Sequence, residues 1–258
     1  MRTTAPEDLT PWCQLPDFRK ELSREDPQHL FYNGGVASDV SASVIKMVIG
    51  AGKFGPPPVS AQIDAAYTAF VHENANDDRH WPKPRNVNRI RYRLNSHPTF
   101  ALGYKHGQVR NFLHFAHRLA FKHKECNASW QMAYVCVANL SNVVSFLDNC
   151  GPMLTEQERV TSLERGQAFL DALQVLVQWD QGIAEFYWSA RPKTHQFQRR
   201  VLGHLETSRM NPLVTWSCWM EETLMGASAK VTKKCHMKTQ VLRALQRYAL
   251  DLHTSFVV

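Results

Sequence analysis

The chain has 258 residues, enough for one large domain or two small ones. Its 44% of hydrophobic and 21% of charged residues exclude wholesale disorder. No apolar run is long enough to cross a membrane, so we expect no membrane partner, and the first residues lack the apolar core of a signal peptide. The six cysteines are scattered without a CxxC pair, which argues against a zinc ribbon or a disulfide scaffold. We therefore expect reduced thiols in a nuclear or cytoplasmic protein.

Positive charge is concentrated in residues 79–124, the basic segment. The net charge of the chain is +7, and this segment contains eleven Lys and Arg, six His and no Asp or Glu. Such a segment attracts polyanions, and its interleaved aromatic residues can stack on bases. The alternative is a solvated basic face whose aromatic residues belong to the core. On the first reading we expect DNA, or RNA, to contact Arg85, Arg89, Arg91, Arg93, Lys105, Arg110, Arg118 and Lys122.

In chain order, residues 1–30 contain four prolines and are expected to be irregular. The rest, residues 31–258, is expected to form a single helix-rich domain. Leu30–Tyr32 has the composition of a short strand. Helices are expected over residues 36–49, ending at Gly50, and over 60–74. The polar residues 75–103 favour a long loop or short strands.

The helical part of the chain is predicted to span residues 104–253. Its first two helices cover 104–123 and 129–148, and a Thr155–Glu158 start leads into a helix reaching about Trp188. Shorter helices follow at 194–206 and 220–235, a strand at Val214–Cys218, and a last helix at 238–253. The predicted fold class is mainly α, with a small amount of sheet. The expected inward residues of the three longer helices are Val109, Phe112, Leu113, Ala116, Leu119; Met132, Val135, Cys136, Leu140, Val143, Leu147; and Val160, Leu163, Leu170, Leu173, Val177.

Two acidic positions are candidates for chemistry. Asp26 opens an Asp-Pro-Gln-His sequence before an apolar run and a glycine turn, where its carboxylate could serve a hard divalent cation. An Asp-Pro turn or a helix cap is the alternative. Glu221 and Glu222 begin a helical pattern between large apolar residues. A half-buried carboxylate there needs a cation or metal partner, and stabilisation of the helix dipole is the alternative.

Basic residues supply a third candidate. Lys193 and His195 stand just before a helical pattern and could meet phosphate or a metal-bound carboxylate. His114 and His117 share one helix face, but without carboxylate or cysteine companions nearby we expect them to be structural or solvated.

The order of these segments resembles the C-terminal part of CACTA-type (En/Spm-like) DDE transposases. The resemblance covers roughly residues 24–230. The matching segments carry Asp26, His29, Gly35 and Val36; Lys105 to Arg110; Pro192, Lys193, His195, His204 and Leu205; and Trp216, Glu222 and Gly226.

The resemblance implies an RNase H-like core interrupted by a helical insertion. Asp26 would be the second catalytic acid and Glu222 the third, with Glu221 competing for that role. Together these acids would hold Mg²⁺ or Mn²⁺ for two-metal chemistry. His29, Lys193 and His195 would support them, and the basic insertion would hold the DNA backbone.

One part of the family pattern is missing. The family has a first Asp on a strand well upstream, whereas only 25 residues precede Asp26, and Asp8 and Asp17 lie in Pro-rich sequence. The family's Cys-rich segment is missing as well. We therefore expect a truncated or degenerate, transposon-derived DNA-binding protein of the nucleus with little or no strand cleavage. The alternative is a non-catalytic helical module that binds nucleic acid or protein.

Overall fold

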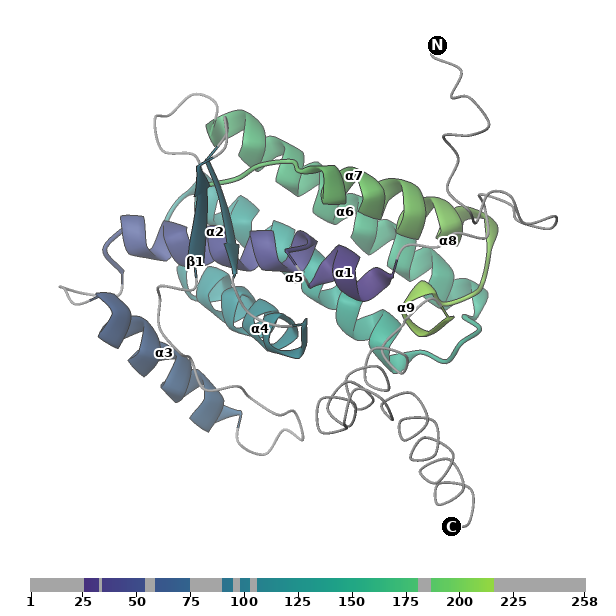
Figure 1. Ribbon diagram of the computed structural model, residues 1–258, viewed down its shortest axis with the longest axis horizontal. Coiled ribbons are helices and arrows are strands. Elements are labelled where there is room, and N and C mark those ends of the chain that lie inside the picture. The colour runs from purple at the N-terminus through teal and green to yellow at the C-terminus, as the bar shows by residue number, and fades with distance from the viewer. Residues whose placement is uncertain are drawn as a thin grey trace, which may run out of the picture. The chain divides into compact units, whose positions relative to one another are not determined.

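The computed structural model describes residues 26–32, 34–53, 59–74, 90–94, 98–102, 106–180 and 187–215. The chain divides into two compact units, Met1–Trp216 and Ser217–Val258, and every described residue belongs to the first. The described part is mainly helical, which confirms the predicted fold class at that level (Figure 1). The helices predicted at 220–235 and 238–253 lie outside the described residues.

Helix α2 (Val36–Gly50) is the central element, and the sequence predicted it. Its residues 36–45 are all buried, because helices α1 (Pro27–Phe31), α4 (His106–His123) and α5 (Ala128–Asn149) pack around it. Strand β2 (Pro98–Leu102) also packs against α2 (Figure 1). Its sequence is rich in Ala, Ser and Val on every side, as expected for a helix that is enclosed rather than half exposed.

The predicted loop or short strands of residues 75–103 contain an antiparallel hairpin. Strand β1 (Ile90–Leu94) pairs with β2 so that Ile90 lies opposite Leu102 and Leu94 opposite Pro98. The hairpin therefore adds a small two-stranded sheet to the helical core.

Helix α3 (Val59–Glu73) is joined to α4 by aromatic packing. Tyr67 stacks on Phe112 with ring centroids 4.9 Å apart and meets Phe115 edge-on at 5.2 Å. Phe70 also contacts Phe115, at 5.5 Å. Phe112 belongs to the face of α4 that was predicted to point inward, and Ile63 of α3 is buried with these rings.

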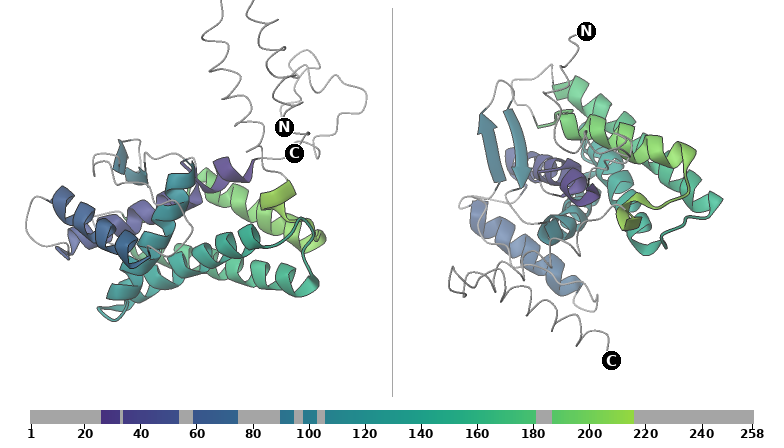
Figure 2. Two further views of the ribbon diagram at one scale, coloured as in Figure 1. Left: turned by 90° about the horizontal axis from the view of Figure 1, so that it is seen from below. Right: turned by 45° about the vertical axis from the view of Figure 1, so that its right-hand side comes forward.

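Helices α5 and α6 (Glu156–Asp180) run side by side (Figures 1 and 2). All five predicted inward residues of α4 are buried, and so are four of the six in α5. Met132 is partly buried, and Val135 is exposed, which corrects its prediction.

The buried face of α6 differs in phase from the prediction. Only Leu173 of the five predicted residues is fully buried; the others, Val160 among them, are partly buried. The small residues Ser162 and Gly166 lie on the buried face, and Leu202 packs directly over Gly166. A count of large apolar residues overlooks such positions, because close helix approach needs small side chains there. The fully buried residues are Ser162, Gly166, Phe169, Ala172, Leu173, Leu176 and Asp180.

The start of α6 follows the predicted capping box. The Glu158 N–H donates to Thr155 Oγ1 at 3.2 Å, and the Thr155 N–H donates to Glu158 Oε2 at 2.7 Å. Its end does not follow the prediction, because α6 is described as far as Asp180 and Trp188 belongs to no helix or strand. The Asp180 carboxylate accepts the backbone N–H groups of Tyr187 and Trp188, which holds this segment in place.

A continuous helical run covers the predicted helix 194–206. It consists of α7 (Pro192–Gln196), the π-helical segment η5 (Phe197–Leu202) and α8 (Gly203–Thr207), and it packs along α6 (Figure 1). Phe197 of η5 meets Phe31 and Phe169 edge-on at 5.5 and 5.6 Å, so one ring links the start of the chain with α6.

Both predicted strands are corrected. Leu30 and Phe31 belong to α1, which also shows that the segment expected to be irregular ends before residue 27. Pro27 suits the first helical position, and the Leu30 N–H donates to Asp26 O at 3.1 Å. Val214 belongs to α9 (Pro212–Thr215), again a helix that opens with proline; residues 216–218 lie outside the described part.

Candidate functional site

Asp26 lies at the N-terminus of α1, one turn before His29. The Asp26 Oδ2 atom is 2.5 Å from His29 Nδ1, and the Asp26 side chain is largely buried whereas His29 is half exposed. The local sequence explains this contact, because residues three apart on a helix face the same side. The carboxylate therefore has an imidazole partner at the place where the sequence predicted an acidic ligand.

Lys193 contacts the same helix α1, although it lies far from Asp26 in the sequence. Its Nζ atom donates to the backbone oxygen of His29 at 2.7 Å, across 164 positions of sequence. Pro192 starts α7, and Phe197, at the start of the adjoining segment η5, packs on Phe31 of α1. The structure thus brings together Asp26, His29 and Lys193, three of the predicted site residues, while His195 is exposed on α7.

A second charged pair involves Arg191, two residues before Lys193, and no sequence pattern indicated it. Arg191 Nη1 is 2.5 Å from Asp39 Oδ1, and both side chains are largely buried. Asp39 lies in the first turn of α2, where the helix dipole favours a carboxylate. Arg191 follows the extended chain from Tyr187, which also receives the Ser43 Oγ hydrogen bond on its backbone oxygen at 2.5 Å.

The segment Tyr187–Arg191, here called the strap, therefore runs along α2. Its contacts on α2 fall at Asp39, Ser43 and Met47, four residues apart and on one face. At one end of the strap the Tyr187 hydroxyl lies 2.3 Å from where a Cβ on Gly50 would stand, so a larger residue there would displace the tyrosine tip. The strap fixes Lys193 relative to α1 and α2.

The predicted metal site involves Asp26 together with Glu222 or Glu221. Within the described residues, no three His, Cys, Asp or Glu side chains come together as a metal-binding group. Asp26 pairs with an imidazole, and the cationic Lys193 binds next to it. The described residues alone do not form a Mg²⁺ or Mn²⁺ site, and Glu221 and Glu222, the remaining predicted acids, lie outside the described part.

The residues predicted to contact nucleic acid differ in their exposure and in their charged neighbours. Arg110 Nη2 is 2.9 Å from Asp148 Oδ2, so an internal carboxylate partly neutralises it. Burial raises the pKa of the Asp148 carboxyl and Arg110 lowers it, while burial and Asp148 raise the pKa of the nearby Tyr32 phenol. Arg118 and Lys122 are exposed on α4. Arg85, Arg89 and Lys105 lie outside the described residues, and for Arg91 and Arg93 only the strand backbone is described.

Exposed aromatic and basic groups gather at one end of α4. Phe121 is 43% exposed and meets Tyr134 of α5 edge-on at 5.6 Å. Lys124 Nζ lies 4.5 Å from the Phe121 ring centroid and 5.4 Å from that of Tyr134. Arg118, Phe121, Lys122, Lys124 and Tyr134 are called the α4 surface below. The sequence indicated its cations, but Tyr134 lies beyond the basic segment and only the α4–α5 packing adds it.

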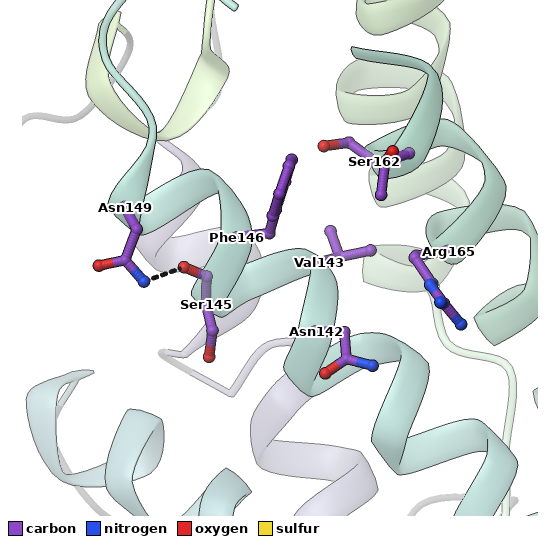
Figure 3. Close-up of a pocket in the computed structure, with 8 residues that line it drawn as sticks. Asn142, Val143, Ser145, Phe146, Asn149, Ser162 and Arg165 are labelled. Carbon is purple, nitrogen blue, oxygen red and sulfur yellow. Dashed lines mark hydrogen bonds between the residues drawn. The ribbon is translucent and has the colours of Figure 1, made fainter. Parts of the chain in front are cut away.

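A separate pocket of about 380 Å³ opens between α5 and α6 (Figure 3). Its lining combines apolar Val143 and Phe146 with polar side chains. The polar residues are Asn142, Ser145 and Asn149 from α5 and Ser162 and Arg165 from α6. The hydroxyl of Ser162 donates to the Glu158 backbone oxygen, and Arg165 Nη1 donates to Asn139 Oδ1 at 3.4 Å. Among the described residues that line it there is neither histidine nor carboxylate, so they supply no nucleophile with an adjacent base.

No protein-family model, curated protein or solved structure matches this chain. Among the described helices, none combines the length and the hydropathy that crossing a bilayer requires. The resemblance to DDE transposases therefore stays a prediction, and the contacts above are the observations that bear on function.

Proposed function

We propose that this chain is a transposon-derived, nuclear DNA-binding protein, related to the catalytic region of DDE transposases, with little or no strand-cleaving activity. The observation that carries the binding function is the α4 surface. There, exposed Arg118 and Lys122 flank the exposed ring of Phe121. Cations on such a surface release counterions from phosphates, and an exposed ring offers stacking.

The ancestry is supported by the meeting of two motif segments. The Asp-Pro-Gln-His segment and the Arg-Pro-Lys-Thr-His segment are joined by the bond from Lys193 to the His29 backbone. In a transposase-like core these segments would surround the catalytic acids. The proposed RNase H-like core further requires Glu222 beside Asp26.

DNA binding is tested by titrating labelled plasmid fragments at several salt concentrations. We expect binding that weakens steeply between about 50 and 200 mM salt, because several phosphates are contacted. Replacing Arg118 and Lys122 together by alanine is expected to lower the salt slope by about two, one for each lost contact. Arg199→Ala, at an exposed cation of η5, is the matched control. Absence of binding at low salt, or equal effects of both sets, contradicts the proposal.

The acid pair is tested by Mn²⁺ binding followed by electron paramagnetic resonance. If Asp26 and Glu222 share one cation, then Asp26→Asn and Glu222→Gln each weaken binding, and the double variant is no weaker than the worse single variant. Independent or absent effects refute the shared site. In a parallel Mg²⁺ or Mn²⁺ plasmid-nicking assay we expect little or no nicking by the parent chain, with both variants as baselines.

A further inference from the structure

A second pocket lies beside the α4 surface and has no part in the Asp26 cluster. Its volume is about 370 Å³, within the range of small-molecule sites. Three helices contribute to it, so its walls are held by the aromatic packing of α3 on α4 and by the α4–α5 contact. The lining residues are Phe70, Asn74, His114, His117, Arg118, Phe121 and Tyr134.

One wall of this pocket consists of three rings in contact, those of Phe121, Tyr134 and His117. Phe121 packs edge-on against Tyr134, and Tyr134 stacks on His117 with centroids 5.6 Å apart and an interplanar angle of 15°. Each ring is fixed by its neighbour, so a ligand ring that stacks on exposed Phe121 orders little that is not already ordered. Stacking on such a platform is tolerant of which base is present.

The polar groups of the pocket complement a base and its phosphate. The Nε2 atom of His117 is buried without a hydrogen-bond partner in the described part of the chain. Burial lowers the His117 pKa, so the imidazole is neutral near pH 7 and offers Nε2 as either donor or acceptor. Arg118 is 59% exposed, and its contact with the exposed Glu73 carboxylate is 3.5 Å long. Such an exposed pair is weak, so the guanidinium can also attract an anion.

We propose that this pocket takes one unstacked base of a single-stranded nucleic acid, with the base against Phe121, its polar edge at His117 and the adjoining phosphate on Arg118. The inference rests on the proposed nucleic-acid binding and makes it specific. A duplex keeps its bases stacked inside the helix and reaches only the cations, so the full chain should prefer single strands over duplexes of equal length.

The test measures the affinity of the full chain for a fluorescein-labelled single strand and for the matching duplex. Phe121→Leu keeps an apolar side chain but removes the ring. It is expected to weaken single-strand binding about tenfold and to weaken duplex binding much less, because a duplex keeps its bases stacked. Trp179→Leu, at an exposed ring of α6, is the matched control and should alter neither.

A measurement on the parent chain covers the case in which the Phe121 variant does not fold. A single strand carrying 2-aminopurine should lose fluorescence on binding, because its base stacks on the aromatic wall. Unchanged 2-aminopurine emission in a bound strand, or equal loss of both DNA forms in Phe121→Leu, overturns the base pocket while nucleic-acid binding stands. Failure of the parent chain to bind either form overturns the proposed function itself.

Discussion

Asp180 shows how a single carboxylate can connect the end of a helix to a later segment of the chain. It lies at the end of α6, and the same oxygen accepts the backbone N–H groups of Tyr187 and Trp188. Burial raises the pKa of this carboxyl, and the two hydrogen bonds oppose that rise. The strap therefore depends on an acceptor that is itself costly to bury.

Substitutions at Asp180 separate its hydrogen bonds from its charge. Asp180→Ala leaves two N–H groups without an acceptor and is expected to lower the free energy of unfolding by about 3 kcal/mol. Asp180→Asn keeps one acceptor oxygen where both bonds meet, so its loss should be much smaller. Urea denaturation measures both, and equal losses would contradict the clamp.

The charge of Asp180 has a pH signature. Because its pKa is raised on folding, the folded chain holds this proton more tightly than the unfolded chain. Stability from this group is therefore present below the unfolded pKa and is lost as pH rises through the folded pKa. Asp180→Asn should flatten that part of the stability profile, whereas an unchanged profile would show that Asp180 does not titrate differently on folding.

The Asp39–Arg191 pair predicts a large and one-sided loss. Arg191→Ala leaves the buried Asp39 carboxylate without its cation and should cost about 3 kcal/mol in urea denaturation. Arg199→Ala is the matched control, because Arg199 is exposed. Similar values for the two variants would show that water, rather than Arg191, compensates Asp39. No pattern could predict this pair, since its members are 152 positions apart and each belongs to an ordinary local motif.

At the scale of elements, close helix packing rests on glycine in α6. A Cβ on Gly166 would stand 2.4 Å from Leu202 Cδ2, so Gly166→Ala overpacks the contact and should cost about 1–3 kcal/mol. Gly151→Ala, with open space around it, should be close to neutral. Adding Leu202→Ala to Gly166→Ala should recover part of the loss. Additive losses in thermal denaturation would argue against a direct clash.

The sequence predicted helices well where they carry one regular apolar face. Helix α4 buries all five residues that its spacing indicated. It failed where short apolar runs have no period, as at Leu30–Tyr32, where proline-initiated helix outweighed strand composition. Of the candidate site, Asp26, His29 and Lys193 were singled out. The contact of Lys193 with His29 depends on the strap, however, and residues 187–188 of the strap were predicted to be helix.

At the scale of the whole molecule, Cys136 reports on complete unfolding. It is fully buried in α5, and burial raises its thiol pKa, so both access and ionisation suppress its reaction. Peptide-resolved alkylation should label exposed Cys126 at once and Cys136 only through opening of the core. Arg191→Ala should speed Cys136 labelling about a hundredfold, the equivalent of its loss of about 3 kcal/mol. Labelling of Cys136 that ignores core stability would indicate a local opening of α5.

The strap also affects how the chain folds during biosynthesis. Helix α2 is complete by Gly50, yet among the described residues the hydrogen-bond partners of Asp39, Ser43 and Met47 on the strap come from residues 187–191. While the intervening chain emerges from the ribosome, that side of a largely buried helix lacks the strap, and Asp39 lacks Arg191. Nascent chains that end before residue 187 should therefore bind chaperones, and chains that include the strap should bind them less.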